Sequence, residues 1–198
     1  MTHNKDLETK IIEAIDRISR AQKILLWDRA KIYGLTPLQT QILLLVSENK
    51  EEKNNISLIS LELGVSQPTI SDAVKTLINK GLLQATVWEK NKHFRILSLT
   101  DKGKEIIKKL KEWDSYLKRP LKKMEEEAKV AFFNYLLNYV VELRNDKTLL
   151  LVRACPLCRY FVQKEDKTFY CKLFNMEMKT QDLRVECPDY EEPIQVLR

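Results

Sequence analysis

The sequence predicts a mostly α-helical protein that carries a small cysteine-rich module at its C-terminal end. Three observations predict it: residues 1–147 show helical spacing of apolar residues, one pair of β-prone segments interrupts them, and all four cysteines follow residue 147. A chain of 198 residues is long enough for one domain with an appendage. We therefore expect one domain over residues 1–147 and a cysteine module over residues 148–198.

The charge distribution supports this division. The chain has 34 Lys and Arg against 28 Asp and Glu, a net charge of +6. Residues 148–198 carry equal numbers of basic and acidic residues, so the whole excess lies in residues 1–147. A basic excess favours a polyanionic partner such as DNA. No apolar stretch is long enough to cross a membrane and no signal-peptide pattern is present, so we expect a cytoplasmic protein.

Two amphipathic helices open the chain. Residues 5–33 place Leu and Ile at intervals of three, four or seven, the spacing of one helical face. Gly34 ends this helix, and Thr36 is an N-cap for a second one that begins with Pro37. A polar stretch over residues 48–55 then forms a loop.

A helix-turn-helix pattern follows. Residues 56–63 form a short helix, Gly64 turns the chain, and Ser66 caps a helix over residues 67–79 that has Pro68 in its first turn. One face of this second helix is apolar and packs onto the domain, while its other face carries small polar groups that fit a major groove. Its N-terminus also favours phosphate.

Two strands and two helices complete the first domain. The β-prone segments 82–87 and 94–99 enclose a charged hairpin tip at residues 89–92, which gives the order of a winged helix-turn-helix. A further helix from Thr100 is expected to run to about Leu117, because Pro120 breaks the helical pattern soon after it. A last long helix is expected over residues 121–144.

Residues 35–110 resemble the MarR family of bacterial transcription regulators. The segments that carry this resemblance read "LTPLQTQILLLV", "LGVSQPTISDAVKTLINKGLL" and "LSLTDKGKEI". The long helices at both ends are similar to the dimerisation helices of the family, which extends the resemblance to residues 5–145. The resemblance implies a homodimer whose recognition helices enter successive major grooves of a near-palindromic operator in double-stranded DNA. It also implies that a small-molecule ligand is possible.

The resemblance also implies a set of DNA-contacting residues. On the recognition helix they are Ser66, Gln67, Pro68, Thr69, Ser71 and Lys75. On the wing, the charges of Lys90, Lys92 and Arg95 themselves predict contacts with the DNA backbone or minor groove. Two departures from the family pattern affect these contacts: Asp72 stands where Arg is frequent, and the wing reads "WEKNKHFR" where an Asp-x-Arg pair is frequent. An acidic residue repels phosphate but accepts a hydrogen bond from cytosine.

The four cysteines predict a metal site. Cys155, Cys158, Cys171 and Cys187 have the spacing C-x2-C-x12-C-x15-C, and neither histidine lies nearby. A reducing cytosol disfavours disulfides, whereas four thiolates bind either a tetrahedral zinc ion or an iron–sulfur cluster. Four free structural thiols are the remaining alternative. The metal would stabilise a segment that is poor in apolar residues.

Aromatic residues near each cysteine favour a [4Fe–4S] cluster over zinc, because aromatic shielding excludes water from a cluster. The stretch is also loosely similar to the cluster-binding segment of high-potential iron–sulfur proteins. We therefore expect a transcription regulator that is switched by redox state, oxygen or metal through the four cysteines. The alternative is a DNA-binding scaffold whose structural zinc module docks a partner protein. No set of Cys, His and acidic residues indicates an enzyme.

Overall fold

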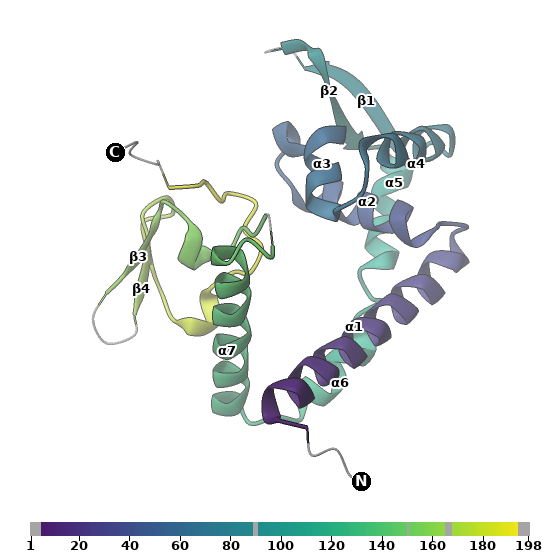
Figure 1. Cartoon of the computed structure of the whole chain (residues 1–198). Coiled ribbons are helices and arrows are strands. Elements are labelled where there is room, and N and C mark those ends of the chain that lie inside the picture. Colours follow the sequence, from purple (N-terminus) through teal and green to yellow (C-terminus); the bar gives the residue numbers. More distant parts are fainter. Residues whose placement is uncertain (1–4, 89–90, 150, 165–167, 194–198) are drawn as a thin grey trace.

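Residues 5–88, 91–149, 151–164 and 168–193 are described by the structure, a computed structural model of the chain. It has two lobes (Figure 1). One lobe is the winged helix. The other combines the last long helix, α7, with the cysteine module, and α1 and α6 extend from the winged helix towards the far end of α7.

Helix α1 (Leu7–Ile32) is long and poorly covered. Asp6 caps it by accepting a hydrogen bond from the Thr9 amide, and among its residues only Leu26 and Ala30 are buried. Near its C-terminal end, Arg29 pairs with Glu112 and donates to the Lys109 carbonyl. These contacts fix one end of α1 to the winged-helix lobe.

The winged-helix lobe has the predicted order of elements. These are α2 (Pro37–Glu48), the 3-10 helix η1 (Glu51–Lys53), α3 (Ile56–Leu63), α4 (Gln67–Asn79), β1 (Leu83–Trp88), β2 (Asn91–Leu99) and α5 (Asp101–Leu110). Thr36 and Gln39 form a capping box on α2, and Ser66 caps α4 as expected. Gly64 adopts φ +62° and ends α3 in the left-handed conformation that glycine tolerates best.

The core of this lobe joins α2, α3, α4 and α5 to the antiparallel pair β1–β2. Ile42, Leu43, Ile59, Ile70 and Leu77 are fully buried in it. Helix α5 approaches the loop before β1 so closely that only glycine fits at position 103. A Cβ on Gly103 would lie 2.1 Å from the Leu82 carbonyl oxygen. The lobe is therefore packed as one unit, with α4 held on its apolar side.

The helices after α5 differ from the prediction. The helix expected to run to Leu117 ends at Leu110, and a separate helix, α6 (Ser115–Lys122), contains Pro120. Pro120 lies inside this helix without ending it. The last helix, α7 (Glu126–Asn145), consequently starts later than the expected position 121.

The cysteine module contains short strands that the sequence did not predict. Its elements are η2 (Cys155–Leu157), β3 (Phe161–Gln163), β4 (Phe169–Cys171), β5 (Met176–Met178) and η4 (Thr180–Asp182). The strands form an antiparallel sheet in the order β3-β4-β5, and the rings of Phe161 and Phe169 stack 5.4 Å apart. No helix in the described part of the chain is long and apolar enough to span a membrane.

The module shares a core with α7. Leu137 is 1% exposed and lies in one cluster with Val152, Ala154, Met178 and Leu183. The predicted boundary at residue 147 falls between these contributors, so the module supplies only part of this second core. Its limited apolar content is thus supplemented by a helix of the preceding domain.

Candidate nucleic-acid interface and cysteine cavity

Helix α4 has the two faces that the sequence predicts. Ile70, Val74 and Leu77 are buried in the winged-helix core. Among the predicted DNA contacts, those on or beside this helix divide by exposure: Ser66, Gln67, Pro68, Thr69 and Lys75 are exposed, and Ser71 is half-buried. Ile78, placed on the apolar stripe from its spacing, is 37% exposed and lies at the edge of the buried face.

The N-terminus of α4 is organised by two hydroxyls. The Ser66 hydroxyl accepts from the Thr69 amide at 3.4 Å and lies 2.8 Å from the Thr69 hydroxyl. Pro68 has no amide hydrogen and the Thr69 amide is used by the cap, so among the first three helical residues Gln67 keeps a main-chain donor for a phosphate. The local sequence therefore supports an exposed, positively polarised helix end.

An ion pair on α4 was not foreseen. The Lys75 ammonium lies 3.1 Å from the Asp72 carboxylate, and both side chains are more than two-thirds exposed. Spacing could have revealed it, since side chains three residues apart are neighbours on a helix. The charge of Lys75 is thus partly balanced before any DNA binds.

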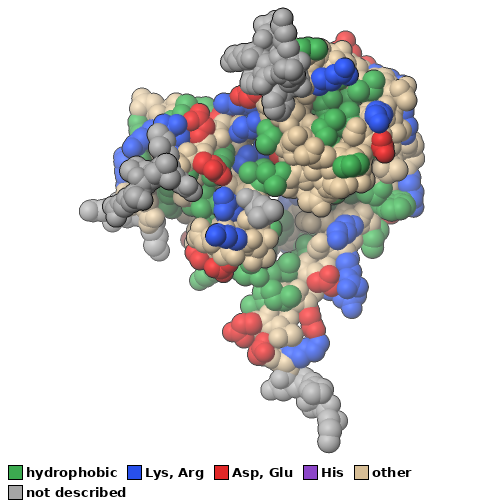
Figure 2. Space-filling view, turned by 45° about the horizontal axis from the view of Figure 1, so that its top comes forward, with side chains coloured by type: hydrophobic (Ala, Val, Ile, Leu, Met, Phe, Trp, Pro, Cys, Tyr) green, Lys and Arg blue, Asp and Glu red, His purple; other side chains and the backbone are tan. Residues whose placement is uncertain are grey.

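The wing is described only in part. Arg95 is exposed on β2 and pairs in register with Val87 of β1. Lys90 and the side chain of Lys92 lie outside the described residues. In the view of Figure 2, Lys and Arg are scattered among acidic and apolar side chains rather than gathered in one patch.

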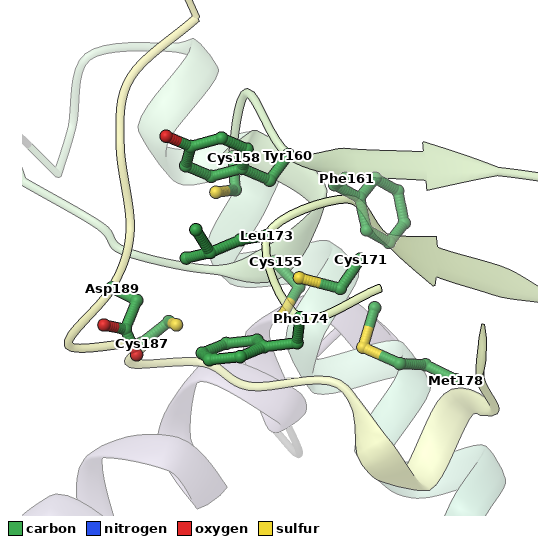
Figure 3. Close-up of a pocket in the computed structure, with 10 residues that line it drawn as sticks. All are labelled: Cys155, Cys158, Tyr160, Phe161, Cys171, Leu173, Phe174, Met178, Cys187 and Asp189. Atoms are coloured by element: carbon green, nitrogen blue, oxygen red, sulfur yellow. The ribbon is translucent and has the colours of Figure 1, made fainter. Parts of the chain in front are cut away.

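All four cysteines line a single cavity in the module (Figure 3). Cys155 and Cys187 are buried, and Cys158 and Cys171 are half-buried. The thiols of Cys158 and Cys187 lie apart from those of Cys155 and Cys171 in this view. The other lining residues are mostly apolar: Tyr160, Phe161, Leu173, Phe174, Met178 and Asp189.

Arg184, which the sequence did not single out, serves this cavity twice. Its amide donates to the Cys155 sulfur at 3.3 Å, and its guanidinium lies 3.9 Å from the Cys187 sulfur. Burial raises the pKa of the Cys155 thiol, and the other three cysteines raise it further. Thiolates at these positions would repel one another, and a bound metal centre would offset their negative charge.

The four thiols are free, and all four belong to the described part of the chain. Within that part, no group of three or more His, Cys, Asp or Glu side chains is placed so that it could hold a metal ion. The structure thus brings the predicted ligands to one cavity without bringing them to one point.

Comparisons with known proteins bear on the first lobe. A MarR family model matches residues 33–87. The structure of a MarR protein from Peptoclostridium difficile aligns with a TM-score of 0.63 and 21% identity, over 76% of this chain and 98% of that one. A MarR regulator from Methanosarcina mazei aligns with a TM-score of 0.56 and 22% identity, over 72% and 98% of the two chains.

The chain has the MarR fold. A third structure, a mutant MarR from E. coli complexed with operator DNA, aligns with a TM-score of 0.51 and 19% identity, over 69% of this chain and 99% of that one. No curated protein sequence matches the chain. Each of these three structures aligns over nearly its whole length. The alignments cover about three quarters of this chain.

Proposed function

We propose that this chain is a sequence-specific DNA-binding transcription regulator that acts as a homodimer and is switched through an iron–sulfur cluster. The observation that carries the proposal is the exposed polar face of α4, with its exposed N-terminus, on a MarR fold. In the E. coli neighbour, the same fold is complexed with operator DNA. By analogy, α4 is the recognition helix and the wing around Arg95 contacts the backbone.

Dimerisation is supported by apolar side chains that the single chain leaves exposed. On α1 and α7 they are Leu7, Ile11, Ile12, Ile18, Ile24, Trp27, Ile32, Phe132, Tyr135, Leu136 and Tyr139. Exposed apolar side chains gathered on two long helices are typical of an interaction surface. A second copy of the chain would cover it and place two recognition helices on one near-palindromic operator.

The four cysteines that line the cavity have the donor chemistry of a four-thiolate cluster, which supports the proposal. Cys155, Cys158, Cys171 and Cys187 would be its ligands, and the aromatic and aliphatic side chains around them limit access of water. The Arg184 amide and guanidinium would stabilise negative charge on the sulfurs. When bound, a [4Fe–4S] cluster supplies a centre that changes charge by one electron and is sensitive to oxygen.

The aromatic lining of the cavity favours a cluster over zinc. Tyr160, Phe161 and Phe174 line it together with the four cysteines. Aromatic side chains exclude water from a cluster, whereas a structural zinc site needs only its four ligands.

Anaerobic purification tests the proposal. We expect brown protein with about four iron and four sulfide per protomer, as expected for one [4Fe–4S] cluster. Stoichiometric zinc without visible absorbance would instead support the scaffold alternative, in which the module docks a partner protein. Titration of the same preparation with duplex selected from a random library tests DNA binding separately: binding should fall steeply with salt.

A further inference from the structure

The cysteine module contacts the winged helix through one buried arginine, Arg153. It lies in the segment between α7 and the first cysteine and is 6% exposed. Its neighbours Val152 and Ala154 are buried in the core shared with α7. Successive residues of an extended segment point to opposite sides, so Arg153 reaches the other lobe.

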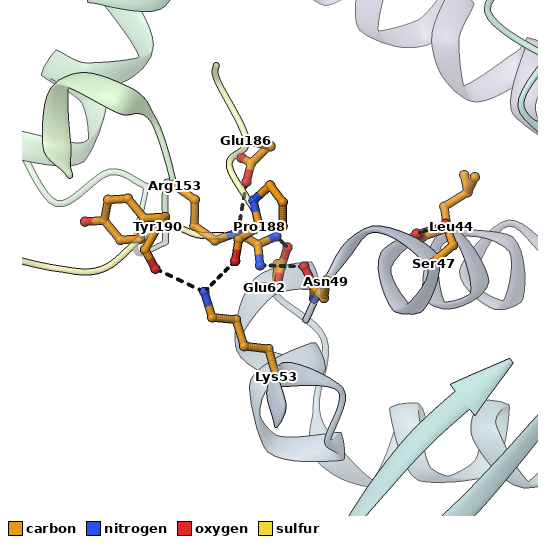
Figure 4. Close-up of polar contacts among 9 residues, drawn as sticks. All are labelled: Leu44, Ser47, Asn49, Lys53, Glu62, Arg153, Glu186, Pro188 and Tyr190. Carbon is orange, nitrogen blue, oxygen red and sulfur yellow. Dashed lines mark hydrogen bonds and ion pairs between the residues drawn. The ribbon is translucent and has the colours of Figure 1, made fainter. Parts of the chain in front are cut away.

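The guanidinium of Arg153 binds groups from both lobes (Figure 4). On the winged helix it donates to the Asn49 side-chain oxygen at 2.6 Å and forms an ion pair with Glu62 of α3. On the module it donates to Glu186 at 3.1 Å. The side chains of Arg153 and Glu62 are 7% and 16% exposed. Burial raises the pKa of the Glu62 carboxyl against the opposing effect of Arg153.

Two lysines extend the contact around Arg153. The Lys53 ammonium of η1 donates to the carbonyls of Pro188 and Tyr190, at 3.3 and 3.1 Å. Lys50 pairs with Asp189 at 2.8 Å. We call the contacts of Arg153, Lys53 and Lys50 across the two lobes the interlobe clamp. Apart from Arg153, every residue that the module contributes to the interlobe clamp lies within three residues of Cys187.

Main-chain hydrogen bonds connect the interlobe clamp to the cysteines. The Cys187 amide donates to the Arg153 carbonyl at 3.0 Å, and the Cys155 amide donates to the Arg184 carbonyl at 2.9 Å. Arg153 precedes Cys155 by two residues, and Glu186 directly precedes Cys187. A cluster bound by Cys155 and Cys187 would therefore cross-link the two segments that hold the winged helix.

On the other side, the interlobe clamp ends on the helix that supports the recognition helix. Glu62 lies one turn from Ile59 of α3, and Ile59 is fully buried in one core with Ile70 and Val74 of α4. Gly64 and Val65 alone separate Glu62 and Leu63 from Ser66, the N-cap of α4. A displacement of α3 therefore displaces α4.

We propose that the interlobe clamp transmits the state of the cysteine site to the recognition helix. The inference rests on the proposed function, and it assigns the regulation of that site to Arg153 and Glu62 as positioning residues. With the cluster bound, the two segments are cross-linked and hold α3 in one orientation. Loss of the cluster leaves the two segments joined by hydrogen bonds and the ion pair alone, which loosens their hold on α3. Two recognition helices about 34 Å apart on DNA then lose their fixed spacing.

The test compares DNA binding with and without the cluster in Glu62→Ala. The probe is a labelled duplex selected by the cluster-loaded wild type from a random library, titrated at fixed salt under anaerobic conditions. We expect the wild type to bind at least about five-fold more tightly when loaded. Glu62→Ala should load the same amount of iron, because Arg153 retains Asn49 and Glu186, yet its two forms should bind with equal affinity.

Glu48→Ala is the matched control. Glu48 ends α2 on the same lobe and forms an exposed ion pair with Lys111 at 3.9 Å, outside the interlobe clamp. It should keep the wild-type difference between loaded and unloaded protein. If Glu62→Ala loads fully and also keeps that difference, the inference is wrong while the proposed function stands. If the wild type itself shows no difference, the proposed switch fails and the inference fails with it.

A measurement on the wild type covers the case in which Glu62→Ala does not fold or load. Removal of the cluster with a chelator should speed amide hydrogen exchange over residues 49–63, where the interlobe clamp ends. Residues 7–24 of α1, which are outside the interlobe clamp, serve as the internal reference. Unchanged exchange over residues 49–63, with the cluster shown to be gone, would overturn the inference.

Discussion

Asp72 and Lys75 form an ion pair of 3.1 Å on the exposed face of α4, the face that would meet DNA. A pair this exposed adds little to stability, about 0.2–1 kcal/mol. The ion pair matters more for DNA binding. Lys75 must leave Asp72 in order to contact a phosphate. Asp72 then either accepts a hydrogen bond from a base or repels the phosphates of the DNA backbone. The two residues therefore affect affinity in opposite directions.

The first prediction concerns Lys75. Lys75→Ala removes one phosphate contact per protomer, so operator binding should weaken and the slope of log Kobs against log salt should become less negative by about 0.9 for each phosphate no longer neutralised. Fluorescence anisotropy at several salt concentrations measures both. Lys31→Ala, which removes an exposed charge on α1 away from the recognition helix, should leave the slope unchanged. An unaltered slope in Lys75→Ala would show that α4 presents another side to DNA.

The second prediction concerns Asp72. Asp72→Asn releases Lys75 and removes the repulsion of phosphate, so affinity for duplex of random sequence should rise by up to about five-fold. If Asp72 accepts from a cytosine amino group, Asp72→Ala, which removes the acceptor, should lower the preference for that base pair by about 1–3 kcal/mol. Selection from a random library with the wild type and both variants measures the change. A lower affinity for random duplex would contradict the assigned repulsion.

The sequence predicts some parts of this molecule better than others, for physical reasons. The caps Thr36 and Ser66 and the turn at Gly64 use local hydrogen bonds and backbone conformations, so their residues are recognisable in the sequence. The break after Leu110 has no comparable local signal, and Pro120 suggested a break in the wrong place. Strands β3 to β5 have three residues each, too few to show a period.

The candidate sites divide in the same way. The cysteines were identifiable because their spacing is visible along the chain, and the structure brings all four to one cavity. Arg153 was not, because its partner Glu62 is 91 residues away and a single arginine carries no pattern. Contacts between distant segments depend on the packing of the two lobes, which a sequence without aligned relatives does not reveal.

The third prediction concerns the number of thiolates. Cys171→Ser leaves three thiolates, so iron and sulfide content should drop sharply while the helical circular dichroism of residues 7–145 is kept. Leu173→Ala is the control, since Leu173 lines the same cavity without supplying a ligand. It should retain the cluster and lose it faster in air. A full complement of iron and sulfide in Cys171→Ser would rule out a four-cysteine cluster.

The fourth prediction concerns the dependence of the cysteine module on α7. Leu137 is buried beneath the module, whereas the adjacent Leu136 is 39% exposed. Leu137→Ala removes a side chain from a core shared by both parts and should cost about 2–5 kcal/mol. The loss falls on the module, which depends on this core, so cluster content should drop together with the midpoint of thermal unfolding.

Leu136→Ala deletes the same atoms from the exposed side of the same helix. It should retain iron and sulfide, although it should weaken a dimer formed through α7. Equal cluster content in both variants would show that the module folds without α7 and would favour an independent domain beginning near residue 148.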